Sequence, residues 1–86
     1  QEHDNRHIAE KMITYFREYI RSGYYLFLSP DRTEFVSALS RKSGVPEDYC
    51  RDLMRTIVTI HSSESINDQQ LLTLNEQIQQ FYKNRK

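Results

Sequence analysis

The stretch Ser37–Met54, "SALSRKSGVPEDYCRDLM", decides the fold, because it predicts two helices joined by a tight turn. Gly44 can adopt a positive φ and end the first helix, with Val45 folding back as a hydrophobic closure. Pro46 suits the first turn of the next helix, since the N–H that it lacks would have no partner there. The pattern occurs in helix-turn-helix motifs that read DNA and also in helical hairpins that only pack a core.

The N-terminal part predicts one long helix followed by an extended connector. Apolar residues three and four positions apart indicate a helix from about Asn5 to Ser22, capped by Asp4 or Asn5 and ended by Gly23. The connector is "YYLFLSPD", residues 24–31, which is aromatic and prone to extended structure. Because a lone strand is not stable, we expect its side chains to dock on the core; an exposed edge that pairs with another chain is the alternative.

Three further helices follow. The second begins at "DRTE", where Asp31 and Glu34 occupy capping-box positions. The third begins at Pro46 and is broken by "HSSES", and the fourth begins at Asn67, which has capping-box spacing to Gln70. Apolar periodicity predicts the buried face of each helix in turn: Ile8, Met12, Tyr15, Phe16, Tyr19 and Ile20; Phe35, Val36 and Leu39; Tyr49 or Cys50, then Leu53, Met54, Ile57 and Ile60; Leu71, Leu74, Ile78, Phe81 and Tyr82.

The predicted fold is therefore all-α, a compact four-helix bundle with a short extended connector after the first helix. Its 86 residues suit a single domain, residues 1–86, with one modest core. The chain opens at Gln1 rather than Met, so we expect it to be excised from a longer protein. It contains no apolar run of 18 residues, so a membrane anchor would have to lie outside this sequence.

Charge and cysteine content narrow the class of protein. There are 12 Lys and Arg against 12 Asp and Glu, and this neutrality is unusual for a dedicated nucleic-acid binder. The single Cys50 cannot form an internal disulfide, which favours a reducing compartment such as the cytoplasm.

Motifs for catalysis, metals or cofactors are not found. His3 and His7 have the spacing of two zinc ligands on a helix, but they lie at a terminus that we expect to be solvated. Cys50 would need an electropositive setting to act as a nucleophile, and Glu47 and Asp48 oppose that, so a buried structural thiol is expected. We predict no enzyme activity, no catalytic residue, no cofactor and no metal.

Aromatic residues supply the candidate site. Five of them crowd the end of the first helix and the connector, and they form either part of the core or an exposed patch for a partner protein. One helical stripe cannot bury them all. The candidate partner-binding residues are Tyr19, Tyr24, Tyr25 and Phe27.

Charge also bears on the helix-turn-helix interpretation. In a helix-turn-helix, the second helix lies close to the DNA phosphates, and here it would present Glu47 and Asp48 to them. The segment from Asp31 to Arg55 contains as many cations as carboxylates, five of each: Arg32, Arg41, Lys42, Arg51 and Arg55 against Asp31, Glu34, Glu47, Asp48 and Asp52. The packing hairpin is therefore the better interpretation, and no nucleic acid is expected.

Two resemblances refine this interpretation. Thr33–Ile57, "TEFVSALSRKSGVPEDYCRDLMRTI", resembles the N-terminal helical hairpin of the bacterial histone-like HU family. In that family the hairpin makes the dimer and a following β-arm grips DNA. Here "HSSESINDQQLLTLNEQIQQ" follows, without a basic arm, so the DNA-binding function does not carry over.

The second resemblance covers most of the chain. It rests on "AEKMITYFREYIRSGYY" (Ala9–Tyr25), on F-x-x-x-L-S-x-K-S-G-V-P (Phe35–Pro46) and on N-x-x-x-L-x-x-L-N-x-x-I-x-x-F-Y (Asn67–Tyr82). Together these resemble the C-terminal cytosolic tail of a bacterial membrane-protein family of unknown function, whose genes neighbour those of MoxR-type ATPases. The resemblance implies a non-catalytic protein-interaction module on a membrane-anchored protein, whose protein partner would be an ATPase or another member of the same complex. The alternative is a small DNA-associated helical domain of helix-turn-helix or HU-hairpin type.

Overall fold

The fold is seen in a computed structural model, which describes residues 4–86. It contains the helices α1 (Asn5–Tyr24), α2 (Thr33–Ser43), α3 (Glu47–Ser62) and α4 (Asp68–Asn84), and no strand occurs in the described part of the chain. The prediction of an all-α four-helix bundle is confirmed.

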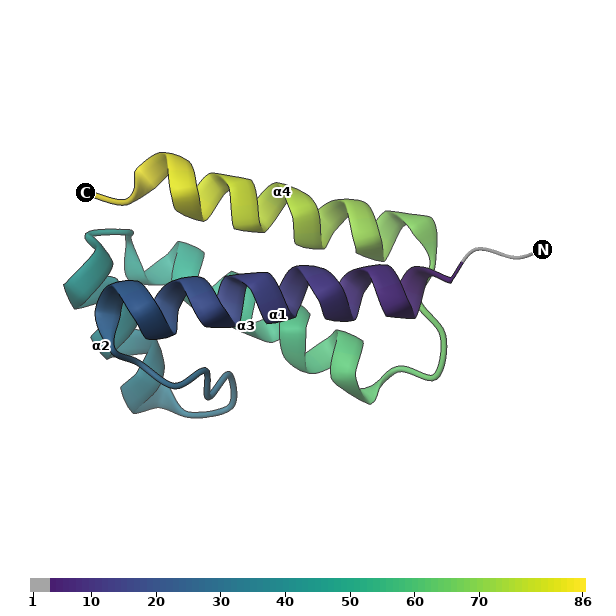
Figure 1. Ribbon diagram of the computed structural model, residues 1–86, viewed down its shortest axis with the longest axis horizontal. Helices are drawn as coiled ribbons and strands as arrows, with labels where there is room; N and C mark the ends of the chain where they lie inside the picture. Colours follow the sequence, from purple (N-terminus) through teal and green to yellow (C-terminus); the bar gives the residue numbers. More distant parts are fainter. Residues whose placement is uncertain (1–3) are drawn as a thin grey trace.

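The long helices α1 and α4 lie side by side and run in the same direction, and α3 runs against both (Figure 1). The short α2 packs across one end of this layer, against α1 and α3. As a result α1, α2 and α4 all finish at one end of a molecule that measures 42 × 23 × 22 Å. At the opposite end Asn5 of α1 donates hydrogen bonds to the Ile66 carbonyl (3.0 Å) and to the Asp68 carboxylate (2.8 Å) at the start of α4.

The buried face of the first helix is slightly rotated from the predicted one: Phe16 and Ile20 are buried as predicted, and Met12 and Tyr19 pack against the core. Ile8 and Tyr15 were expected inside, but they are 45% and 66% exposed. Ala9 and Ile13 are buried instead, and together with Phe16 and Ile20 they form a second stripe at helical spacing. Two apolar stripes compete on this helix, and the one with the smaller side chains faces α3 and α4.

The end of α1 is also different. Gly23 was predicted to end the helix, but the helix continues through Tyr24, and Tyr25 adopts the left-handed conformation (φ 60°). Continuing the helix places the Tyr24 ring edge-on against Tyr19, with 5.9 Å between the ring centroids. This packing explains why the helix does not stop at the glycine.

The connector that follows α1 docks on the core as predicted, but only with alternate side chains. Leu26 and Leu28 pack against the core, whereas Tyr25 and Phe27 point away from it. No ladder of strand hydrogen bonds forms here.

The start of α2 lacks the predicted capping box. The Arg32 N–H donates to the Ser29 carbonyl (3.1 Å), so the residues from Ser29 to Arg32 form a turn that includes Asp31. The N-cap is Arg32, whose side chain makes no capping bond, and Asp31 lies one residue too early to cap the helix.

The turn between α2 and α3 follows the prediction closely. Gly44 has φ 82° and donates its N–H to the Ser40 carbonyl, and Val45 is fully buried. Helix α3 begins at Glu47, with Pro46 as its N-cap, one residue later than predicted. At α4 both bonds of the predicted capping box between Asn67 and Gln70 are present.

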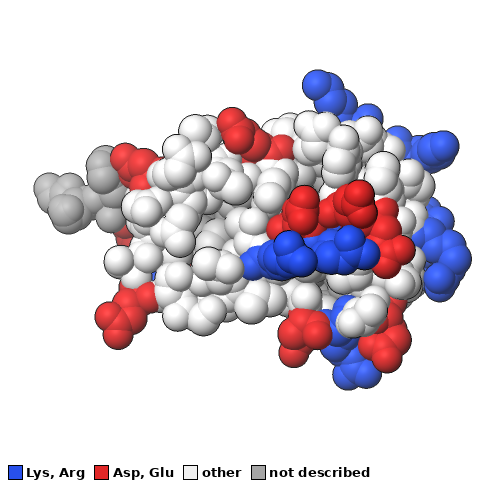
Figure 2. Space-filling model, turned by 180° about the vertical axis from the view of Figure 1, so that it is seen from behind, with Lys and Arg blue, Asp and Glu red and all other residues white. Residues whose placement is uncertain are grey.

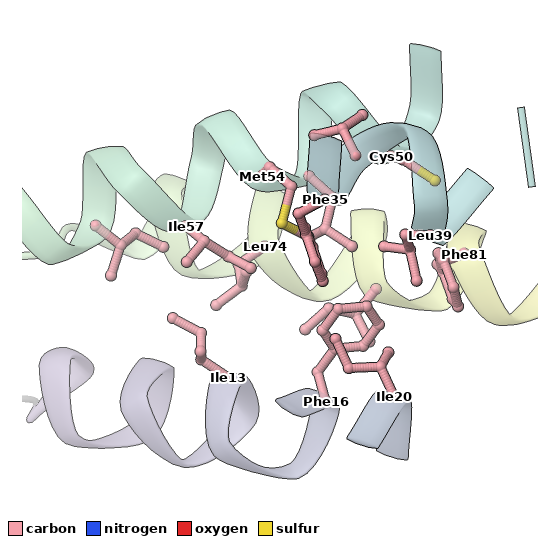
Figure 3. Close-up of a cluster of buried hydrophobic side chains, with 14 of the residues drawn as sticks. Ile13, Phe16, Ile20, Phe35, Leu39, Cys50, Met54, Ile57, Leu74 and Phe81 are labelled. Atoms are coloured by element: carbon pink, nitrogen blue, oxygen red, sulfur yellow. The ribbon is translucent and has the colours of Figure 1, made fainter. Parts of the chain in front are cut away.

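The core is a single cluster that all four helices share (Figure 3). Phe16 and Phe81 meet edge to face at its centre, with 5.2 Å between the ring centroids. Of the alternatives on α3, Cys50 is buried and Tyr49 is 42% exposed. The predicted shared core of Leu39, Leu53, Ile57, Leu74 and Ile78 is confirmed. Within residues 4–86 no helix is long and apolar enough to cross a membrane.

Candidate functional site

The four candidate residues separate into a packed pair and an exposed pair. Tyr19 and Tyr24 are partly buried against the core, whereas Tyr25 and Phe27 are 83% and 78% exposed. The sequence predicted one aromatic patch, and the structure divides its members between an aromatic cluster and a protruding connector.

The aromatic cluster joins the ends of α1 and α4. The Tyr19 ring meets Tyr82 of α4 almost at right angles, with 5.0 Å between centroids, and Tyr24 packs on its other side. Burial raises the pKa of the Tyr24 hydroxyl to about 12, and the neighbouring Tyr19 hydroxyl adds to this rise. Burial also raises the pKa of Tyr82. The phenols of Tyr24 and Tyr82 therefore stay neutral at physiological pH.

Two cationic side chains of this chain contact the aromatic cluster: one lies over its rings, and the other binds a backbone carbonyl beside them. The Arg85 guanidinium lies over the rings of Tyr19 and Tyr82, at 5.7 and 5.4 Å from their centroids, as in a cation–π contact. The Lys42 ammonium of α2 donates a hydrogen bond of 3.0 Å to the Tyr24 carbonyl. Sequence reasoning did not connect Arg85 with the tyrosines; Arg85 is the residue directly after α4, and its side chain folds back over the last turn of that helix to reach Tyr82.

The exposed pair lies on a segment that is held on both sides. The Tyr25 N–H donates to the Arg21 carbonyl (3.1 Å), the Leu26 N–H donates to the Ile20 carbonyl (3.4 Å), and Leu28 docks on the core. Tyr25 and Phe27 therefore protrude from a backbone that is fixed in place. Large exposed aromatic side chains on a fixed backbone are typical anchors of protein interfaces.

Other candidate chemistry gains no support from the geometry. His7 is exposed, His3 lies outside the described residues, and among residues 4–86 no three His, Cys, Asp or Glu residues group as metal ligands. Burial raises the pKa of the Cys50 thiol to about 11, with Glu47 adding to the rise, so the nucleophilic thiolate is scarce at neutral pH.

The helix that would read DNA in a helix-turn-helix presents paired charges. Arg51 contacts both Glu47 and Asp48 of the first turn at 3.3 Å, and Arg55 lies 3.9 Å from Asp52. Carboxylates therefore already neutralise the cations on this face, where Figure 2 shows blue and red side chains in contact. A phosphate backbone would compete with these carboxylates for the same cations.

Comparison with protein families assigns the chain. The DUF4350 C-terminal helical domain matches residues 1–85, which is nearly the whole length. The chain belongs to this family. No curated protein and no solved structure matches the chain. Membership of the DUF4350 C-terminal helical domain family agrees with the four helices.

Proposed function

We propose that this DUF4350 C-terminal helical domain is a non-catalytic protein-interaction module, with Tyr25 and Phe27 as its anchors. The observation that carries the proposal is the exposure of these two large aromatic side chains on a segment whose neighbours are docked. An apolar ring left in water on a preorganised backbone gains free energy when a partner covers it, and little conformational entropy is lost on binding.

The proposed setting is the cytosolic tail of a membrane-anchored bacterial protein, with an ATPase as the partner. The resemblance to the tail of a membrane-protein family whose genes neighbour MoxR-type ATPases supports this setting. The single, buried Cys50 is compatible with a reducing compartment. In this setting the module would recruit the ATPase to the membrane and would itself carry out no chemistry.

The test is capture of the ATPase by the immobilised chain from a lysate of the source bacterium. The double variant Tyr25→Ser/Phe27→Ser is expected to lose the ATPase, because both anchors are removed while the core is untouched. The matched control is Tyr15→Ser/Tyr49→Ser, which removes two exposed rings elsewhere on α1 and α3. Tyr24 is left intact in both variants, because it packs on Tyr19 and its loss would disturb the fold.

Two results would overturn the proposal. One is equal capture of the ATPase by the wild type, the anchor variant and the control. The other is retention of duplex DNA at moderate salt, with release by Arg51→Glu/Arg55→Glu, which would restore the helix-turn-helix interpretation.

A further inference from the structure

The end of the bundle where three helices finish carries a concentration of positive charge. The last turns of α2 and α4 contain Arg41, Lys42 and Lys83, and Arg85 and Lys86 follow α4 directly. We call these five residues the basic end. The contact between their elements is direct, because the Lys86 N–H donates to the Ser43 carbonyl of α2 at 2.7 Å.

Part of this charge has a structural role. Lysine and arginine near a helix C-terminus stabilise the partial negative charge of the last carbonyls. Lys42 binds the Tyr24 carbonyl and Arg85 binds the Tyr82 carbonyl in this way. The side chains of Arg41 and Lys83 have no such contact, and within residues 4–86 neither side chain makes a hydrogen bond or an ion pair.

Several arginines elsewhere in the molecule are paired with carboxylates. Arg6, Arg21, Arg51 and Arg55 each have a carboxylate within 4 Å, whereas no member of the basic end is paired with one inside the described structure. Asp4, Glu64 and Asp68 gather instead at the opposite end, near the starts of α1 and α4. Figure 2 shows Lys and Arg along the right-hand edge, whereas Asp and Glu lie at the left and also over the centre and the lower right. In a chain of zero net charge, the five cations of the basic end therefore lie without a paired carboxylate, although Glu47 and Asp48 begin α3 at the same end and pair with Arg51.

We infer that the basic end docks an acidic segment of the partner protein, with Tyr25 supplying the adjoining apolar contact. This inference rests on the proposed function, which it extends by naming the chemistry of the partner. Carboxylates are the complement of five cations that lack them, and the Arg85 guanidinium, positioned by contacts with two tyrosine rings, is a preorganised fork for a carboxylate. Tyr25 immediately follows the last residue of α1 at this end.

The connector favours a peptide over a lipid surface as the source of the negative charge. The N–H groups of Phe27 and Leu28 donate no hydrogen bond within the described chain. They lie in the segment that carries the exposed Tyr25 and Phe27. An acidic peptide in extended conformation can accept hydrogen bonds from these groups as an added strand while its side chains meet the cations, whereas lipid headgroups offer acceptors without the spacing of a strand.

The experiment uses a short fluorescent peptide that alternates Glu with Phe and Leu, and its affinity for the full chain is followed by fluorescence anisotropy. Arg41→Glu/Lys83→Glu is expected to weaken binding by roughly fivefold to tenfold, because two favourable charge contacts become repulsive. These two side chains make no contact that the fold needs. In case the charge-reversal variant misfolds, Arg41→Gln/Lys83→Gln is measured as well, and it is expected to lower the affinity for the peptide by a smaller factor. The matched control, Lys11→Glu/Arg55→Glu, changes the net charge equally at other places and is expected to bind as the wild type does.

The outcomes separate this inference from the proposed function. Equal weakening by the basic-end variant and the control would show a net-charge effect and overturn the inference, as would equal binding of a peptide with Lys in place of Glu. Binding to phosphatidylserine vesicles without binding to the peptide would mean that the ligand is a bilayer and would also overturn the inference.

If the basic-end variant still captures the ATPase from lysate as the wild type does, the inference fails while the proposed function stands. If the peptide result holds but Tyr25→Ser/Phe27→Ser still captures the ATPase, the proposed function fails instead.

Discussion

At the two glycines, the expected effect of a substitution by alanine depends on the backbone angle φ of the position. Gly44 has φ 82°, and a Cβ there would run into the side chain of Lys86. Gly23 lies inside α1 at an ordinary helical angle, and a Cβ there would meet nothing within 4 Å. Gly44→Ala is therefore expected to lower the free energy of unfolding by about 1–2 kcal/mol, whereas Gly23→Ala is expected to raise it by about 0.5–1 kcal/mol.

Urea denaturation of the two variants checks this contrast directly. Each variant carries the same chemical change, one added methyl group, so the difference in sign isolates the backbone conformation. A stabilising Gly44→Ala would mean that α2 runs on past Ser43 and that the turn is not the one described. The sequence could identify Gly44 because Val and Pro follow it, but it gave no comparable signal against Gly23, whose role depends on the ring of Tyr24 packing on Tyr19.

At the scale of the element, the sequence was sufficient to predict a helix cap where both hydrogen-bonding residues lie within one helical turn. The capping box at α4 was predictable because Asn67 and Gln70 satisfy each other's backbone N–H groups across three residues. The same reasoning failed at α2, because Pro30 and Asp31 are used by the preceding turn. It was only partly right for the buried face of α1, where the choice between Ile8 and Ala9 is made by packing against α3 and α4 and not by the helix itself.

The caps provide a matched test at this scale. Asn67→Ala is expected to destabilise the protein by about 1 kcal/mol, since the Gln70 N–H loses its acceptor. Asp31→Ala is the control, and because Asp31 makes no capping bond its effect should stay within about 0.5 kcal/mol. Thermal melts monitored by circular dichroism measure both. A loss from Asp31→Ala as large as that from Asn67→Ala would restore the capping box at α2 and contradict the described start of that helix.

At the scale of the whole molecule, the helix count and most core positions follow from periodicity, but the arrangement of the helices does not. That α1 and α4 run in the same direction brings Tyr19 to Tyr82 and Arg85, and no pattern within either helix records this pairing. The same arrangement gathers the ends of α1, α2 and α4, so the basic end exists only after folding. The candidate site could therefore be placed near the connector from sequence, while its cationic part depended on tertiary structure.

The shared core gives the prediction that tests this arrangement as a whole. Leu53 is 1% exposed and lies in the cluster that joins all four helices, whereas Leu72 on α4 is 49% exposed. Leu53→Ala is expected to cost about 2–5 kcal/mol, because it removes buried methyl groups and leaves a cavity, and Leu72→Ala should cost about 0.5 kcal/mol or less. A domain of this size has on the order of 5–15 kcal/mol in total, so Leu53→Ala shifts the urea midpoint strongly. If it leaves too little folded protein to measure, Ile57→Val is expected to show the same direction at about 0.5–1.5 kcal/mol. Equal, small losses at Leu53 and Leu72 would mean that α3 does not turn this face to α4, and the bundle as described would be wrong.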